Sequence, residues 1–374
     1  MVINIAATGR FHVLDLAREL DALGHDVKFY SYVPSRRCRK FGLPPKCCVS
    51  LLPFVLLPLA LIRVFPKSLF CRDLLQWWMD FLVGHFMRRC DVFIAMSGIY
   101  LNAFRRAKKR FGALTVMERG STHVKDFYEV MKRRPGAEPE KRLWHRMNGV
   151  REIAGYNTVD HIAIASEHVR DSFIANGISE SKLWINPYGV DVSMFKPTVP
   201  SGEYDVIMVG TWSFCKGADR LEEACKRLGV SLLHVGSSGD IPYDDAVSVT
   251  HVGVVDQRRL PEYYAKAKIF ALHSREEGLA LVQVQAMACG LPIVCSQHTG
   301  GRDLRKFADS PEWIVETGDD TVEELMHCLE RGLKMAVKQS SPRSYFKNRD
   351  VFSWRAYARR YEQYMEASRH DSDK

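Results

Sequence analysis

The chain of 374 residues lacks several patterns that would assign it to a class at once. Its ten cysteines include no Cys-x-x-Cys pair and no Cys/His spacing suited to zinc, which argues against a structural zinc site. No Gly-x-Gly-x-x-Gly follows the first apolar run at residues 2–7, which disfavours a dinucleotide-dependent dehydrogenase. No recognised nucleic-acid motif with interleaved aromatic residues occurs, so we expect no nucleic-acid partner.

Neither disulfide bonds nor a secretory leader is expected. Cys225, Cys289, Cys295 and Cys328 fall inside apolar segments, as free thiols do in a reducing compartment. The chain enters a predicted strand at residues 2–6 without the charged and apolar segments of a signal peptide. We therefore expect a cytoplasmic protein, and association with a membrane stays open.

The positive charge of the chain is unevenly distributed. The formal net charge is +9, and the excess gathers in clusters at residues 105–110 and 132–134. Such clusters favour anionic partners, namely nucleotide phosphates or acidic lipid head groups, although a solvated helix face explains each of them equally well.

Two apolar stretches need a location in the fold. Residues 48–65 are almost wholly apolar but are interrupted by Pro53, Pro58 and Arg63, and residues 74–86 add Trp77 and Trp78. The first stretch is too short for a confident membrane-spanning helix. We expect both stretches to be buried core; the alternative is a surface that enters the membrane interface beside the basic clusters.

Apolar runs alternate with helical patterns along the whole chain, which predicts parallel sheets with helices on both faces. The pattern stops at Pro197, Pro200 and Gly202 and restarts near residue 205, which is typical of a linker between two doubly wound units. We predict a first domain over residues 1–197 and a second over residues 203–351.

The segment of residues 274–294 carries most of the functional information. A polar turn leads into a predicted helix from Gly278 to Cys289, whose amino terminus would suit a diphosphate. On a helix, Glu277 and Gln285 would be separated by about 12 Å of rise, enough to reach two ends of a nucleotide-diphosphate sugar. From these residues alone, an amphipathic helix with a terminal carboxylate is the simpler interpretation.

Residues 277–294 resemble the Glu-x7-Glu region of the family-4-type retaining GT-B glycosyltransferases, the glycosyl transferases group 1. Gly210 and the Lys216-Gly217 pair resemble that family's loop in which lysine neutralises the donor diphosphate, and residues 186–191 resemble its Gly-Val-Asp turn. The resemblance implies the GT-B fold, two Rossmann-like domains facing a central cleft, with a carboxyl-terminal helix at residues 352–367 that crosses back onto the first domain.

The same resemblance implies which residues contact the donor. They are Gly210, Thr211, Lys216, Gly253, Val254, Glu277, Gly278, Leu279, Ala280, Leu281 and Gln285. Two of them depart from the family: Gln285 stands where a second glutamate is usual, and Thr211 where an arginine is usual. Either Lys216 neutralises the diphosphate alone, or Arg275 or Arg302 supplies the missing cation.

The first domain should contribute loops that line the cleft. We expect this lining to include residues of the first loop and of the loop after residues 114–117: Gly9, Arg10, His12, Arg119 and Ser121. The family often presents a histidine near the donor sugar, which makes His123 the candidate here, although a histidine without a role fits the sequence as well. Glu277, Lys216 and His123 are thus the predicted catalytic residues.

The resemblance implies a retaining glycosyltransferase that moves a sugar from a nucleotide-diphosphate sugar to a glycan, a lipid-linked or a small-molecule acceptor. No cofactor and no metal are expected, because the only Asp-x-Asp, at residues 371–373, lies in a polar tail. Two alternatives stay open: a nucleotide-sugar-binding protein that has lost catalysis, which Thr211 and Gln285 allow, and another nucleotide-sugar enzyme on this fold, such as an epimerase.

Overall fold

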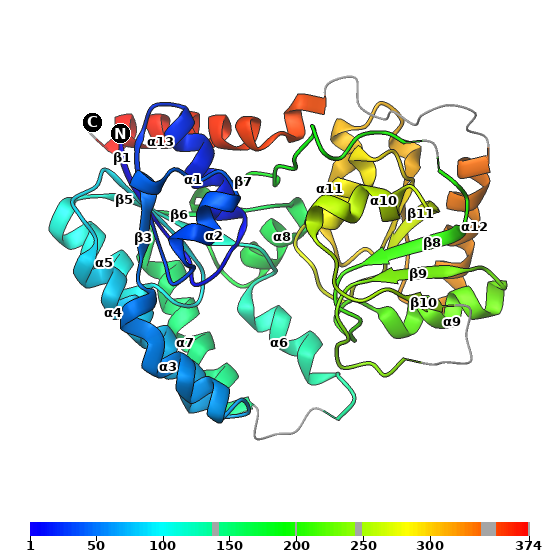
Figure 1. Cartoon of the computed structure of the whole chain (residues 1–374), viewed down its shortest axis with the longest axis horizontal. Helices are drawn as coiled ribbons and strands as arrows, with labels where there is room; N and C mark the ends of the chain where they lie inside the picture. The colour runs from blue at the N-terminus through cyan, green and yellow to red at the C-terminus, as the bar shows by residue number, and fades with distance from the viewer. Residues whose placement is uncertain (137–141, 199, 244–248, 338–348, 373–374) are drawn as a thin grey trace.

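The structure is a computed structural model, and it describes residues 1–136, 142–198, 200–243, 249–337 and 349–372. Two α/β units lie side by side, and a long carboxyl-terminal helix runs along one edge of the first (Figure 1). In each unit the paired strands of the described residues are parallel, with strand orders that place the first strand near the middle: β3-β2-β1-β4-β5-β6-β7 and β10-β9-β8-β11-β12-β13. The expected fold, two Rossmann-like domains of the GT-B type, is confirmed.

The first sheet is built from short apolar strands buried on both faces, as parallel strands between helix layers require. Its strands are β1 (Val2–Ala6), β2 (Asp26–Ser31), β3 (Cys48–Ser50), β4 (Val92–Met96), β5 (Leu114–Arg119), β6 (His161–Ile164) and β7 (Leu183–Ile185). Its helices are α1 (His12–Ala22), α2 (Ser35–Lys40), α3 (Leu52–Val64), α4 (Leu69–Phe86), α5 (Leu101–Phe111), α6 (Val124–Lys132), α7 (Arg142–Thr158) and α8 (Glu167–Ala175).

The second sheet repeats this plan. Its strands are β8 (Tyr204–Val209), β9 (Leu232–Val235), β10 (Val249–His251), β11 (Ala267–Leu272), β12 (Ile293–Cys295) and β13 (Ile314–Glu316). Its helices are α9 (Ala218–Leu228), α10 (Leu260–Tyr264), α11 (Leu281–Ala288) and α12 (Val322–Val337). The predicted linker falls between β7 and β8, the last strand of the first sheet and the first strand of the second.

The last helix, α13 (Trp354–Ser372), returns to the first domain. Glu362 pairs with His25 at 2.9 Å, and Arg360 donates to the side-chain oxygen of Asn186 at 2.6 Å. At the start of this helix, Trp354 packs on Gly189, where a Cβ would lie 2.7 Å from the indole ring. The Gly-Val-Asp turn therefore needs glycine to admit the crossing helix.

The prediction that residues 48–65 and 74–86 are buried core is wrong for much of their surface. In α3 only Val55 and Pro58 are buried, and α4 leaves Trp77 and Trp78 more than a third exposed. The reason is position: α3 packs on the outer side of α4, and α4 packs on α5. Among the described residues, no helix is long and apolar enough to cross a membrane.

The predicted helix start at Gly278 is also wrong. Helix α11 begins at Leu281, and its N-cap Ala280 is extended. Residues 274–280, called here the acidic loop, are therefore not helical, and the helical rise expected between Glu277 and Gln285 does not apply.

Candidate active site

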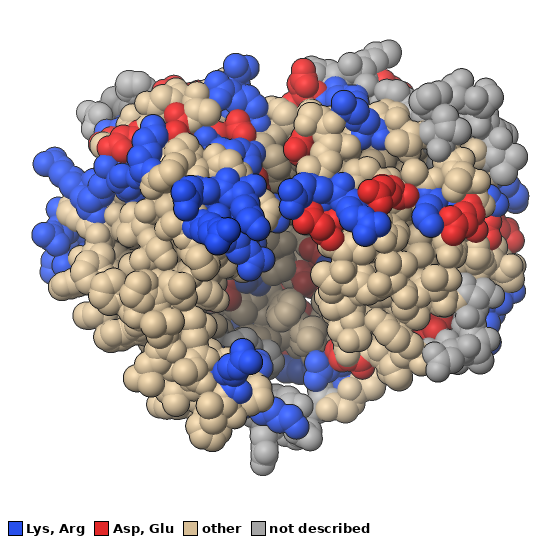
Figure 2. Space-filling model, in the orientation of Figure 1, with Lys and Arg blue, Asp and Glu red and all other residues tan. Residues whose placement is uncertain are grey.

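The two domains meet through loops at the carboxyl ends of their strands. Ser166, which follows β6, donates its hydroxyl to the carbonyl oxygen of Gly278 at 3.1 Å. A Cβ on Gly278 would lie 2.1 Å from the carbonyl oxygen of Gly120, so only glycine permits this approach. The acidic loop thus lies directly on the first domain. Figure 2 shows a hollow between the two halves of the molecule.

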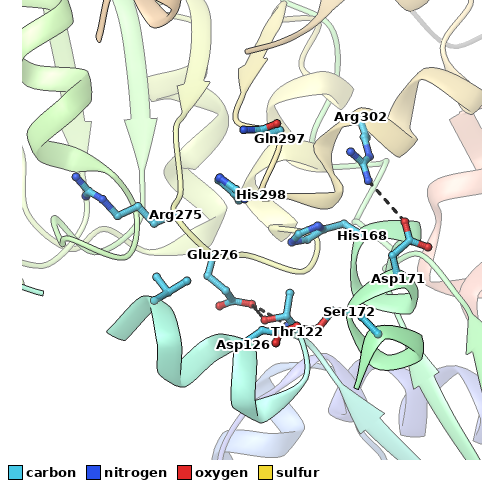
Figure 3. A pocket seen from close by; sticks show the side chains of 12 residues that line it. Thr122, Asp126, His168, Asp171, Ser172, Arg275, Glu276, Gln297, His298 and Arg302 are labelled. Atoms are coloured by element: carbon cyan, nitrogen blue, oxygen red, sulfur yellow. Dashed lines mark hydrogen bonds and ion pairs between the residues drawn. The ribbon is translucent and has the colours of Figure 1, made fainter. Parts of the chain in front are cut away.

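Glu276 of the acidic loop is hydrogen-bonded to the first domain. Both the backbone N–H and the hydroxyl of Thr122 donate to its Oε1, at 2.8 and 2.9 Å, and both residues are buried (Figure 3). A buried carboxylate held by two donors from the opposite domain fixes how the loops face each other. Sequence reasoning missed this residue, because nothing in Arg275-Glu276-Glu277 shows which carboxylate turns to which partner.

Glu277 of the acidic loop forms an ion pair with Lys216, which lies between β8 and α9. Their side chains are 16% and 26% exposed, so a ligand can reach both. Lys216 is placed by Gly217, which has a φ of +67° and on which a Cβ would lie 1.9 Å from the carbonyl oxygen of His273. Burial lowers the pKa of the Lys216 ammonium, whereas Cys215 and Glu276 act in the opposite direction. The structure thus brings two of the three predicted catalytic residues together.

The loop after β8 lies beside the loop after β9. Gly210 has a φ of +140°, and its carbonyl oxygen accepts from Nε2 of His234 at 2.9 Å. Thr211 is exposed, with its hydroxyl 3.2 Å from Oγ of Ser237. The small Thr211 side chain does not fill the space beside this loop, and it adds no positive charge there.

The remaining predicted donor residues differ in accessibility. Gly253 has a φ of +81° and Val254 is 78% exposed, whereas Leu279 and Ala280 are buried. Leu281 opens α11 and is half-buried. Gln285 is only 4% exposed, and its Oε1 accepts from the Tyr264 hydroxyl at 3.3 Å. Its predicted contact with the donor stays a prediction.

Neither arginine proposed to replace the missing cation is unpaired. Arg275 makes two contacts of 2.6 Å with the carboxylate of Asp219, and Arg302 lies 3.3 Å from Glu316. Of the three candidate cations, Lys216 is therefore the one that pairs with Glu277 of the acidic loop.

The structure places His12 inside the first domain. Its Nε2 lies 3.0 Å from Oε2 of Glu118, and its ring lies 4.4 Å from that of Tyr188. The Tyr357 hydroxyl of α13 donates to the other Glu118 oxygen at 2.8 Å. Because α13 covers this network, His12 joins the crossing helix to the sheet and does not face the cleft as expected.

Arg10 and Arg119 support loops at the cleft. Arg10 donates to the Gln257 side chain of the second domain at 3.0 Å, and its guanidinium lies over the Phe41 ring; Gly9 precedes it in the same loop. Arg119 is buried, and its Nε donates to the carbonyl oxygens of Ser121 and Thr122, at 3.1 and 3.0 Å. Arg119 thus shapes the loop that holds Glu276.

His123 is the predicted catalytic residue that the structure does not bring to the ion pair. Its side chain is 1% exposed, and its ring packs against Tyr156 and Phe173. It caps α6, with Nδ1 accepting from the Lys125 N–H at 3.3 Å. Burial lowers its pKa to about 4, so the ring is neutral at physiological pH. This environment is that of a structural histidine.

A pocket of about 490 Å³ opens beside Glu276, on the side of α6 and α8. His168 from α8 and His298 from the loop after β12 both line it, and Arg302 contacts Asp171 at its edge (Figure 3). Nε2 of His298 also lies 3.0 Å from Oδ1 of Asp320. Four separate segments form this pocket, so no local motif could predict it.

Family models match both halves of the chain. One, described as Glycosyltransferase Family 4, matches residues 10–194, and another, described as Glycosyl transferases group 1, matches residues 203–334. The chain belongs to the group 1 glycosyltransferases. The family resemblance predicted from residues 277–294 is thereby confirmed.

Individual relatives of this glycosyltransferase are distant. A D-inositol 3-phosphate glycosyltransferase of Xylanimonas cellulosilytica is 26% identical over 50% of this chain and 51% of that protein. An MMP alpha-(1->4)-mannosyltransferase of Mycolicibacterium hassiacum is 24% identical over 93% of this chain and 91% of that protein.

Solved structures agree on the fold. Sucrose-phosphate synthase from Thermosynechococcus elongatus has a TM-score of 0.71 at 19% identity, over 99% of this chain and 100% of that one. The Anabaena protein HepE, solved with UDP-glucose, has a TM-score of 0.64 at 14% identity, over 98% of this chain and 100% of that one. At such identities the likeness establishes the two-domain architecture alone.

Proposed function

We propose that this glycosyltransferase retains the anomeric configuration, takes its sugar from a nucleotide-diphosphate sugar and needs no metal. The observation that carries the proposal is the Lys216–Glu277 ion pair in the cleft between the domains. The two groups suit the two demands of the reaction: a cation for the leaving diphosphate, and a carboxylate for the sugar hydroxyls.

Donor binding would exchange the partners of this pair. The Lys216 ammonium would move to the diphosphate oxygens, where it stabilises the charge that grows as the bond to the anomeric carbon breaks. Glu277 would accept hydrogen bonds from the sugar. The acceptor hydroxyl would attack from the face that the diphosphate leaves, and the departing oxygen would take its proton. The contacts of Glu276 and Ser166 across the cleft would keep water out.

The charge on the rim of the cleft supports an anionic donor. Arg36, Arg37 and Lys40 of α2 and Arg258 of the second domain line a groove of about 560 Å³ that bridges the two halves. Figure 2 shows Lys and Arg side chains gathered on both sides of the hollow at this level. Such a cluster raises the local concentration of a negatively charged substrate.

For the acceptor we propose a hydroxyl of a glycan or of a lipid-linked sugar, approaching from the loops of the first domain. Relatives named for transfer to D-inositol 3-phosphate and for mannosyl transfer support a polyhydroxyl acceptor. All ten cysteines are free, which supports work in the cytoplasm.

Turnover of Glu277→Gln and Lys216→Met variants tests the proposal. Nucleoside diphosphate release is measured over a panel of nucleotide sugars, with and without acceptor. We expect each variant to lose about 10²–10³-fold in kcat, because each removes a charge aimed at the transition state. The matched control is the exposed pair Lys266–Glu203, 3.1 Å apart on the same domain, as Lys266→Met and Glu203→Gln.

Three further readouts separate the alternatives. Nuclear magnetic resonance of the product should show the anomeric configuration of the donor, and a chelator should leave the rate unchanged. Turnover of donor without acceptor would indicate an epimerase. Thermal stabilisation by a nucleotide sugar without any turnover would indicate a binding protein, and wild-type rates in both variants would refute the assigned roles.

A further inference from the structure

The hairpin formed by α3 and α4, residues 52–86, carries an apolar face that the fold leaves uncovered. Of sixteen exposed large apolar side chains on the described residues, ten belong to this hairpin. They are Phe54, Leu56, Leu57, Val64, Phe65, Phe70, Trp77, Trp78, Phe81 and Phe86. Soluble proteins seldom expose apolar side chains in such a concentration without a partner.

Several of these side chains contact one another within and between the two helices. The Phe54 ring of α3 lies 5.4 Å from that of Phe86 in α4, and Trp78 stacks on Phe81 at 5.3 Å. The Trp78 indole N–H donates to the carbonyl oxygen of Phe54 at 2.8 Å, which joins the two helices. Beneath them, buried Asp80 pairs with Arg151 at 2.7 Å and fixes α4 to the domain. This ion pair thus holds the helix that carries the apolar face in a fixed position on the domain.

The charged side chains of the hairpin all have one sign at its surface. Arg63, Lys67 and Arg72 are exposed, and Arg89 follows just beyond α4. The only acids in residues 52–90 are Asp73 and Asp80, and both are buried. In Figure 2 the surface over α3, at lower left, is mostly tan, with Lys or Arg at its lower end and no Asp or Glu.

We propose that this face docks the protein on an anionic lipid bilayer, with the helices lying in the interface. Tryptophan and phenylalanine are the side chains that settle at the boundary between head groups and acyl chains, and neighbouring cations pair with anionic head groups. Neither helix is long enough to cross the membrane, which fits a monotopic contact. A second copy of this face would bring like charges together, so the cationic surround favours an anionic surface over self-association.

The docking face lies on the first domain and uses none of the residues assigned to the donor. Its position would place the cleft close to the membrane surface and so favour an acceptor that is itself anchored in lipid. The docking does not depend on the proposed activity, because partitioning is measured without turnover.

Vesicle flotation of the full chain tests the inference. Vesicles of phosphatidylcholine are compared with vesicles that also contain phosphatidylglycerol, at low and high salt. We expect at least about tenfold stronger partitioning onto the anionic vesicles, reduced by salt, with a blue shift of tryptophan emission on binding. No flotation with either vesicle would overturn the inference.

Matched variants locate the contact. Leu57→Ser with Phe70→Ser should weaken partitioning about tenfold or more, because these side chains are 71% and 69% exposed and contribute their burial only when bound. Ile174→Ser, at a side chain 42% exposed on α8, is the control for a lost apolar side chain.

Charge reversal is tested separately. Arg63→Glu with Lys67→Glu should abolish the preference for anionic vesicles, whereas the same reversal at Arg331 and Lys334 of α12 should leave it unchanged. Circular dichroism and the thermal midpoint verify that each variant is folded. Equal partitioning of all variants would overturn the inference. So would light scattering that shows a dimer which Leu57→Ser dissociates without changing partitioning, because the face would then bind a second copy.

Discussion

Single residues around the acidic loop divide the work between catalysis and architecture. Adjacent carboxylates take opposite tasks: Glu277 pairs with Lys216, whereas Glu276 turns away to Thr122. Among the histidines of the first domain, His12 and His123 are both enclosed by later elements, α13 over the first and α8 beside the second. A residue type that often acts in catalysis can therefore do so only where its side chain is accessible to a substrate.

His123 should make the stability of the protein fall in mild acid. Its pKa is lowered from 6.5 to about 4 by burial, so between these values the unfolded chain takes up a proton that the folded chain excludes. Unfolding free energy should therefore fall as pH drops from 7 to 5, with up to about 2 kcal/mol due to this group.

The His123→Asn variant keeps an oxygen that can cap α6 but does not titrate. We expect its urea-unfolding free energy to change less than that of wild type between pH 7 and 5, while its turnover at pH 7 stays within a few-fold. Parallel pH slopes would contradict the buried neutral state. A loss of turnover at unchanged stability would instead restore His123 to the catalytic group.

At the scale of elements, loops at the carboxyl ends of strands hold the site, and glycines decide how closely they approach. Gly217 must take a left-handed φ of +67° with no space for a side chain, because the carbonyl of His273 lies there. Gly229 ends α9 at nearly the same φ, +66°, with nothing within 4 Å. The two glycines cap opposite ends of α9 with nearly the same φ, and they differ in how closely they are packed.

Gly217→Ala and Gly229→Ala therefore form a matched pair. We expect Gly229→Ala to cost about 1 kcal/mol, for backbone strain alone, and Gly217→Ala at least about 2 kcal/mol, because its Cβ also displaces the carbonyl of His273, just after β11. Urea unfolding measures both. Only Gly217→Ala should also lower turnover, since it moves Lys216; equal losses in stability and activity would contradict the tight contact.

At the scale of the whole molecule, buried hydrogen bonds join the two domains at the acidic loop. Glu276 accepts twice from Thr122, and Ser166 reaches Gly278 across the same gap. Elsewhere the two domains are connected by the chain itself and by α13, which packs along the first domain. We therefore expect the contacts near the acidic loop to limit how far the two domains can separate.

Glu276→Ala should loosen these contacts. The buried Thr122 N–H would lose its acceptor, a cost of about 1–3 kcal/mol, so amide hydrogen exchange in residues 120–123 should accelerate and kcat/KM should fall. Glu223→Ala, at an exposed carboxylate on α9, is the control. Thr122→Val combined with Glu276→Ala should show a non-additive effect. Unchanged exchange in this loop would show that other contacts hold the domains.

Contiguous patterns in the sequence determined the fold class and the family, and they carry the prediction of the donor loops. Apolar runs that alternate with helical patterns predict parallel sheets, because helices cover both faces of such a sheet. Lys216-Gly217 and residues 277–294 are local segments whose spacing survives folding. The family resemblance of these two segments singled out Glu277 and Lys216 one by one, and the structure shows that they form an ion pair.

Only the tertiary structure decided which surfaces are covered. Whether α3 is core or surface depends on α4 and α5, and whether His12 and His123 face the cleft depends on α13 and α8. The helix start moves to Leu281 because distant partners, Gly120 and Ser166, hold the acidic loop extended. Burial and loop shape are set by contacts between segments far apart in the chain, and periodicity within one segment carries no information about them.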